Sequence, residues 1–295
     1  MVVTPLAGCT PAAGPAPPSG STPPAAAVSA SASPPSVASA EPTGPAALSP
    51  WPFLPDGCPP GRHDVRQWRR IDPAAVTVDQ RYSLNYSQCS CWDVSIRDGV
   101  AGAEAHPDTR PAIPPGLRVP DRWGPPRVIK RGRSGFLVGF NHGEWGGALR
   151  WYSESGPLKR ELLDDNVVDL LQVPAGFIAF TGLAHLGSDD GRATEIIDTG
   201  TLFRLGRSVD LGSAPRAVLL EGDGAVLVVT MAGISRISPS FQVTGLLSTR
   251  WGSFYPVSLA REGTIAYVGM RGVVAEVDLA ADTPTETWLS PADLK

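Results

Sequence analysis

The feature that most restricts the fold is a weak internal repeat in the second half of the chain. From Pro125 onward, short alternating segments and Gly-bearing turns follow one another in the same order four times. The glycine that opens the second segment of each unit recurs at separations of 41, 48 and 39 residues, at Gly135, Gly176, Gly224 and Gly263. A period of about 40 to 50 residues is typical of four-stranded repeat units.

The last unit shows the pattern of strands and turns best. It contains four expected strands, at Pro256–Ala260, Thr264–Met270, Val273–Leu279 and Thr283–Ser290. The unit before it has the same order of segments, and two more units begin at Arg127 and Val167. Short strands joined by tight turns form an antiparallel meander.

One such meander cannot bury both of its faces, so it must stack on its neighbours. The sequence therefore predicts an all-β fold, a β-propeller of four four-stranded antiparallel blades over residues 125–295. Residues 61–124 contain further alternating segments, which predict either a degenerate fifth blade or a disulfide-held N-terminal cap. A β-sandwich is the alternative fold, but its strands need no self-similarity at this period.

The beginning of the chain has a composition that cannot form a core. Between Thr10 and Pro50, every residue is Pro, Ala, Ser, Thr or Gly except for Val28, Val37, Glu41 and Leu48. So few apolar side chains cannot offset the entropy cost of ordering the backbone. We expect residues 10–60 to be a disordered linker, which its prolines keep extended.

Charge excludes two classes of partner. All 25 Lys and Arg residues lie from Arg62 onward, together with all but two of the 29 acidic residues, so this part of the chain is close to neutral. Nucleic acids and anionic lipid surfaces require a basic face. Arg66, Arg69 and Arg70 cluster around Trp68, and we interpret them as a solvated edge. We expect no nucleic-acid partner.

Residues 1–9 contain a possible lipidation signal. The run Leu6-Ala7-Gly8-Cys9 resembles the lipobox of bacterial lipoproteins, in which the Cys becomes the lipidated first residue of the mature chain. The residues before it lack a basic region and a full apolar region, so the resemblance implies a true start upstream of Met1. It further implies a periplasm-facing lipoprotein of the cell envelope, and Thr10 suits an outer-membrane destination. Without an upstream start, the protein is soluble, either cytoplasmic or secreted. No run of 18 apolar residues occurs, so membrane contact would depend on a lipid at Cys9.

Three further cysteines lie near the start of the folded part. In an oxidising compartment, Cys58 is expected to pair with Cys89 or Cys91, which leaves one thiol over. Together with His63 these cysteines offer four metal ligands, but their spacing matches no zinc motif. We favour the disulfide and predict no metal site and no cofactor.

Two insertions between strands carry the candidate binding residues. The first, residues 140–147, contains His142, Glu144 and Trp145 among three glycines. The second, residues 185–191, contains His185, Asp189 and Asp190. Loops on a rigid scaffold commonly carry recognition, although a long hairpin turn would explain both insertions without a ligand. Calcium at the two aspartates is disfavoured, because the spaced acids of a calcium-binding loop are missing. We expect Asp190-Gly191 to form the tip of a hairpin, which explains these residues without a metal.

The sequence contains no recognisable catalytic motif. There is no Gly-x-Ser-x-Gly, no phosphate-binding glycine loop and no His-Glu-x-x-His. We therefore predict no catalytic residues and favour a non-enzymatic, envelope-associated protein that binds another protein through its blade loops. An immunity or inhibitor lipoprotein is one version of this role. The alternative is a propeller-type hydrolase or lyase with an axial pocket, which would require acids or a His–acid pair to converge there.

Overall fold

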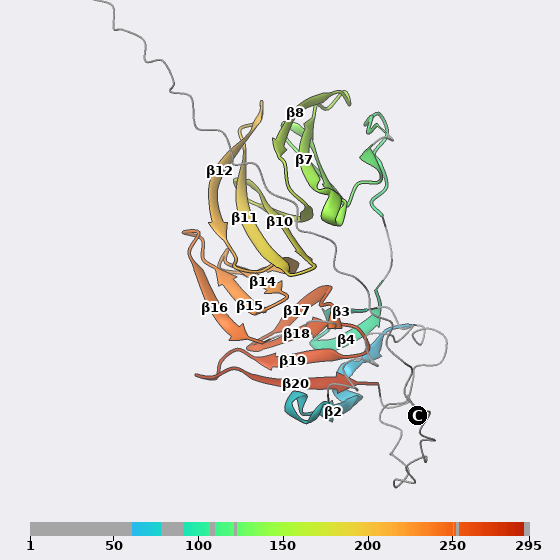
Figure 1. Ribbon diagram of the computed structural model, residues 1–295, viewed down its shortest axis with the longest axis vertical. Helices are drawn as coiled ribbons and strands as arrows, with labels where there is room; N and C mark the ends of the chain where they lie inside the picture. Colours follow the sequence, from blue (N-terminus) through green and yellow to red (C-terminus); the bar gives the residue numbers. More distant parts are fainter. Residues whose placement is uncertain are drawn as a thin grey trace, which may run out of the picture. The chain divides into compact units, whose positions relative to one another are not determined.

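The structure is a computed structural model that describes residues 61–77, 91–106, 110–120, 123–249, 251 and 254–291. The expected linker at residues 10–60 lies outside these ranges. Almost all of the regular structure is β-strand (Figure 1). Among the described residues, no helix has the length and apolar character needed to cross a membrane.

Four antiparallel meanders follow one another along the chain, and in each of them neighbouring strands pair in chain order. The first blade consists of β5 (Val128–Gly132), β6 (Gly135–Asn141), β7 (Gly147–Tyr152) and β8 (Leu158–Leu163). The second consists of β9 (Val167–Val173), β10 (Gly176–His185), β11 (Ser188–Asp198) and β12 (Phe203–Asp210).

The third blade consists of β13 (Pro215–Leu220), β14 (Val226–Thr230), β15 (Gly233–Ile237) and β16 (Val243–Ser248). The fourth consists of β17 (Ser258–Glu262), β18 (Ile265–Gly269), β19 (Val274–Asp278) and β20 (Thr285–Ser290). The short strand β2 (Arg69–Ile71) pairs with β20 and becomes the fifth strand of this last sheet. The N-terminal part of the chain is thereby joined to the C-terminal blade.

A smaller sheet precedes the four blades. It has three strands in the order β1 (His63–Asp64), β4 (Val100–Ala105) and β3 (Trp92–Arg97). The edge strand β3 packs against β17 and β18 of the fourth blade. The hydroxyl of Ser258 joins the two sheets, because it donates to the Trp92 carbonyl at 2.9 Å and accepts from the Val94 N–H at 3.0 Å. The smaller sheet therefore stacks on the fourth blade, and whether it is a degenerate fifth blade or a cap stays a prediction.

The blades stack face to face through apolar side chains. The first strand of each blade contacts the first strand of the next, from β5 through β9 and β13 to β17. One apolar cluster fills each interface, and its largest members are fully buried aromatic residues, among them Phe177, Phe180, Trp251 and Trp288. Successive stacking through the innermost strands is the packing of a β-propeller, so the predicted fold class is confirmed.

The face of the first blade that points away from the second blade is also covered. Leu117 and Trp123, from the segment that leads into β5, pack against Phe140 and its neighbours. The Trp123 and Phe140 rings meet edge to face at 6.1 Å. The Arg150 guanidinium carbon lies 3.7 Å from the Trp123 ring centroid, which adds a cation–π contact.

The repeating glycines lie where the repeat predicts them. All four fall at the turn between the first and second strands of a blade, and all have positive φ. Gly135 and Gly176 open their strands, and a Cβ on either would overlap a carbonyl oxygen of the third strand. Gly224 and Gly263 instead lie within the turn itself, where a Cβ would have space. The glycines therefore mark one topological position but serve two different backbone needs.

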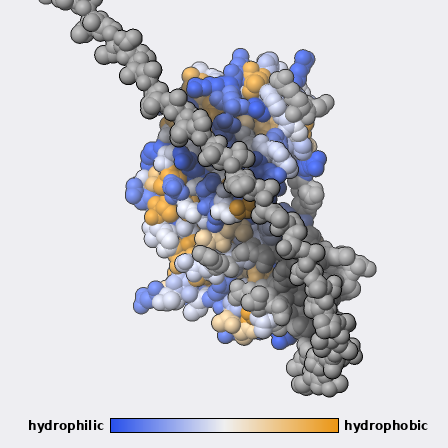
Figure 2. Space-filling model, viewed as in Figure 1, coloured by the Kyte–Doolittle hydropathy of each residue, from blue (hydrophilic) through white to orange (hydrophobic). Residues whose placement is uncertain are grey.

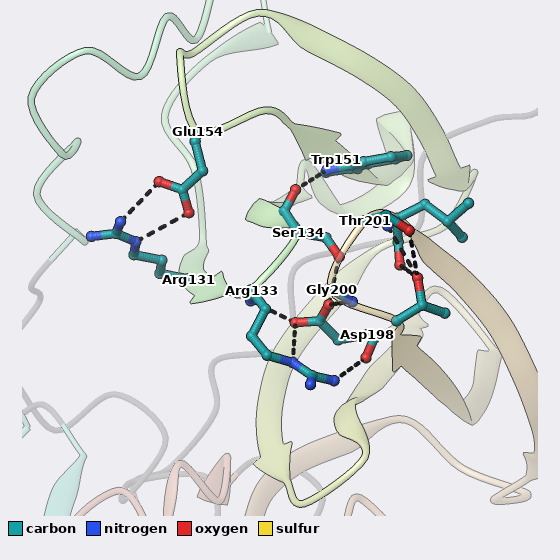
Figure 3. A network of polar contacts seen from close by, with 10 residues as sticks. Arg131, Arg133, Ser134, Trp151, Glu154, Asp198, Gly200 and Thr201 are labelled. Atoms are coloured by element: carbon teal, nitrogen blue, oxygen red, sulfur yellow. Dashed lines mark hydrogen bonds and ion pairs between the residues drawn. The ribbon is translucent and has the colours of Figure 1, made fainter.

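A polar clamp connects the first and second blades at that end (Figure 3). Asp198, at the end of β11, accepts hydrogen bonds from the Arg133 N–H at 2.6 Å, the Ser134 hydroxyl at 2.5 Å and the Gly200 N–H at 2.9 Å. The Arg133 guanidinium donates back to the Asp198 carbonyl at 2.5 Å, and the Trp151 indole N–H donates to the Ser134 carbonyl at 2.9 Å. Because Asp198 is only 5% exposed, these bonds satisfy a buried carboxylate.

Candidate functional site

The first insertion folds into a tightly held loop. The short 3-10 helix η4 (Gly143–Trp145) lies between β6 and β7. The buried side chain of Asn166, from the start of the second blade, donates to the Gly143 carbonyl at 2.8 Å and accepts from the His142 N–H at 3.1 Å. A further bond runs from the Gly143 N–H to the Asn141 side chain at 3.0 Å. The loop backbone is therefore fixed by both blades.

The second insertion lengthens strands and adds no loop. β10 and β11 are the longest strands of the structure, and they meet in a two-residue turn at Leu186–Gly187. Both turn residues have positive φ, +46° for Leu186 and +93° for Gly187, as a primed hairpin turn requires. The expectation that Asp190–Gly191 forms the hairpin tip is wrong. Gly191 pairs with Gly182 inside the hairpin, where a Cβ would overlap the Ser213 carbonyl oxygen of the next blade.

The two insertions come together on adjacent blades. Both connect the second strand of a blade to the third, so they lie on the same face of the propeller. Contact between them includes a polar contact of Glu144 Oε2 with His185 Nδ1 at 3.4 Å, which is an ion pair when the imidazole is protonated. Trp145 and Leu186, the residues next to this pair, are 83% and 89% exposed. We call Glu144, Trp145, His185 and Leu186 the tip surface.

His142 does not belong to the tip surface. Its side chain is partly buried, and the ring lies 6.1 Å from the Phe140 ring. Its buried Nε2 has no hydrogen-bond partner among the residues that the structure describes. Glu144 pairs with His185 instead of His142. The structure therefore gives no His142–Glu144 acid–base pair, which an enzymatic role for this loop would need.

The two aspartates of the second insertion have different surroundings. Asp189 accepts two hydrogen bonds from the third blade, from the Ser213 hydroxyl at 2.9 Å and the Ala214 N–H at 2.8 Å. It therefore fastens the hairpin to that blade. Asp190 is exposed and faces an open pocket of about 350 Å³, which it shares with Asp164, Asp165, Asp210 and other polar residues. In the described part of the chain, no group of acidic, His or Cys side chains has an arrangement that could hold a metal ion.

The cysteines are only partly described. Cys91 has a free thiol, and its Sγ lies 3.5 Å from the Tyr255 carbonyl. Burial raises the pKa of this thiol, against the opposing influence of Arg271. Cys9, Cys58 and Cys89 lie outside the described residues. With Cys91 unpaired, a disulfide of Cys58 with Cys89 stays a prediction, as does lipidation of Cys9.

Two residues important for the tip surface were not singled out from the sequence. Leu186 is hard to recognise as a turn residue, because leucine is rare at positive φ and only the following glycine signals the turn. Asn166 stands outside both insertions, and its capping of the η4 loop depends on contacts between blades. A Leu-Gly pair between two alternating segments was the one available signal for Leu186.

Comparison with known proteins adds no family assignment. No protein-family model matches the chain, and no curated protein matches it. Solved structures with similarity include hydrazine synthase from Kuenenia stuttgartiensis, with 18% identity and a TM-score of 0.39 over 52% of this chain and 53% of that chain. Virginiamycin B lyase from Staphylococcus aureus has 14% identity and a TM-score of 0.41 over 75% and 73%. The chain spans about half the length of the hydrazine synthase chain that it matches. These similarities assign no activity to it.

Proposed function

We propose that this β-propeller is a recognition protein that binds another protein through the tip surface. The observation that carries the proposal is the exposure of Trp145 and Leu186 on two contacting loops of adjacent blades. Large apolar side chains held out into solvent by a rigid scaffold are typical of binding sites, and tryptophan is the residue type most enriched among energetic anchors.

The backbone at Leu186 supports the same role. A non-glycine residue at φ +46° costs roughly 1 kcal/mol relative to glycine or asparagine in the same turn. The side chain recovers none of this cost by burial, since it is 89% exposed. A leucine at such a position is best explained by a contact that forms only with a partner.

Loop rigidity further favours binding. The bonds from Asn166 and Asn141 fix the backbone of η4, so little conformational entropy is lost when a partner docks. The apolar residues on the face shown in Figure 2 form small groups scattered among hydrophilic ones. A compact anchor of two side chains with a polar rim is therefore in keeping with the character of the surface.

The experiment is site-specific photo-crosslinking in cells of the source species. A photoreactive phenylalanine analogue is placed at position 145 or 186, and at Leu158 of β8, which is 42% exposed, as the matched control. We expect one discrete adduct from positions 145 and 186 and none from 158. The Trp145→Ala/Leu186→Ala double variant should bind the captured partner roughly 30-fold more weakly. Equal adducts at all three positions, or unchanged affinity of the double variant, would remove the tip surface as the binding site.

A further inference from the structure

Three arginines from three different blades converge at one end of the innermost strands. Arg127 directly precedes β5, Arg216 lies in β13, and Arg271 follows β18 in the turn toward β19. First strands of successive blades start on the same face of a propeller, and the turn between second and third strands returns to that face. The topology thus places all three residues on one face of the propeller.

An aromatic ring connects two of these arginines. The Arg271 guanidinium carbon lies 4.2 Å from the Tyr255 ring centroid, and that of Arg216 lies 5.7 Å from it. Nε of Arg216 donates to the Pro256 carbonyl at 3.3 Å, and the Arg271 N–H donates to the Phe254 carbonyl at 2.7 Å. Both arginines are therefore fastened to the segment around Tyr255, which itself has a φ of +46°.

Arg216 is a partly buried arginine with other arginines near it. Its pKa is lowered from the ordinary value, first by burial and then by the guanidinium of Arg127, with a smaller effect in the same direction from Arg271. Among the residues that the structure describes, no carboxylate forms an ion pair with Arg216 or Arg127. A guanidinium remains charged at neutral pH, so its burial beside like charges is costly until an anion joins it.

We propose that Arg127, Arg216 and Arg271 form a binding site for a small anion that carries a carboxylate or phosphate group. Each guanidinium offers a planar fork of N–H donors that matches the oxygens of such a group. The Tyr255 ring lies against the guanidinium groups of Arg216 and Arg271, and these cation–π contacts help to orient them. The site is distinct from the tip surface and does not depend on the proposed function.

The test is calorimetric titration of the whole chain with inorganic phosphate and, separately, with succinate, at low and constant ionic strength. We expect saturable binding of at least one of them, and the one that binds identifies the ligand class. Arg216→Met should weaken this binding by about tenfold or more, since a charge-assisted hydrogen bond is lost. Arg127→Gln, at an exposed position where the fold is not at risk, should weaken it as well.

Arg204→Gln on β12 is the matched control, because Arg204 is an exposed arginine away from the cluster. Its variant should bind the anion as the wild type does. The proposal is overturned if neither anion saturates the protein, or if the affinity of the Arg204 variant falls as far as those of the Arg216 and Arg127 variants.

Discussion

Asp198 offers the sharpest test of how the blades are held together. Its carboxylate is 5% exposed and accepts three hydrogen bonds, two of them from the β5–β6 turn of the preceding blade. Asp198→Ala removes the acceptor but leaves the Arg133 and Gly200 N–H groups and the Ser134 hydroxyl in place. Those donors are then desolvated without a partner.

The magnitude follows from the number of donors. An unsatisfied buried donor costs about 1–3 kcal/mol, and water can enter to satisfy some of the three once the carboxylate is gone. We expect Asp198→Ala to lower the free energy of unfolding by roughly 3–5 kcal/mol. Asp198→Asn keeps the shape and one acceptor oxygen, so it should cost about half as much.

Urea denaturation at pH 7 and at pH 3 measures both the loss and its origin. Burial raises the pKa of Asp198, but the bonds from Ser134, Gly200 and Arg133 outweigh it, so the pKa lies below the ordinary value of 3.8. The stability that the carboxylate contributes is therefore complete well above pH 4 and is lost as the pH falls through the lowered pKa. The difference between wild type and Asp198→Ala should shrink at low pH.

Asp190→Ala is the matched control, because Asp190 lies in the same strand but is exposed. It should change stability by no more than about 0.5 kcal/mol. A loss below about 1 kcal/mol for Asp198→Ala, or one that is the same at both pH values, would refute the clamp as an energetic link between blades.

Three further outcomes are expected. Gly176→Ala should lower the free energy of unfolding by about 1–3 kcal/mol in urea melts, because a Cβ at φ +146° would overlap the Ile196 carbonyl oxygen. Gly222→Ala is the control and should change it little, because a Cβ there has open space. In a variant with Ser at the other three cysteines, the Cys91 thiol should react with a maleimide at pH 7 more slowly than a free cysteine, since burial raises its pKa; equal rates would contradict this. Metabolic labelling with a palmitate analogue should mark the chain expressed from an upstream start and leave Cys9→Ser unmarked, and an unlabelled wild type would end the lipoprotein interpretation.

The fold could be predicted because its determinants are local. Alternation fixes which faces of a strand are buried, and glycines at a constant interval mark the same turn in each blade. The strand that begins the second blade starts at Val167, as expected, and the first begins one residue after Arg127. The smaller sheet was harder, because part of its region carries no repeat. Residues 61–124 left a fifth blade and a cap equally open.

The candidate site was less accessible from sequence because its pairs are formed between blades. Glu144 and His185 are 41 residues apart, and nothing in either insertion specifies that they meet. Nothing in the sequence specifies the contact of Asp189 with Ser213 either. Asp189 was expected to bind a ligand, but its hydrogen bond with Ser213 holds the hairpin to the third blade. The Asp190-Gly191 pair predicts a hairpin tip, but the close approach of the third blade, and not turn geometry, requires Gly191.

The distribution of arginine partners over the two faces of the propeller gives functional meaning to this arrangement. On the face that holds the turns between first and second strands, Arg133 pairs with Asp198, and Arg236 and Arg261 both pair with the buried Glu221. The Arg133–Asp198 and Arg261–Glu221 pairs link neighbouring blades, and the Arg236–Glu221 pair lies within the third blade.

On the opposite face, Arg127 and Arg216 lack such a carboxylate within the described residues, and the tip surface exposes its two large apolar side chains. Natural proteins retain uncompensated charge and exposed apolar area mainly where something else binds, because both lower the stability of the free protein. Replacing Arg216 by Met should therefore stabilise the ligand-free chain or leave it unchanged, whereas the same change at Arg236, which removes one of the two arginines that pair with Glu221, should destabilise it. If both substitutions lower the free energy of unfolding in urea melts by similar amounts, the arginines of the two faces stabilise the fold equally. That result would contradict the assignment of a ligand-binding face.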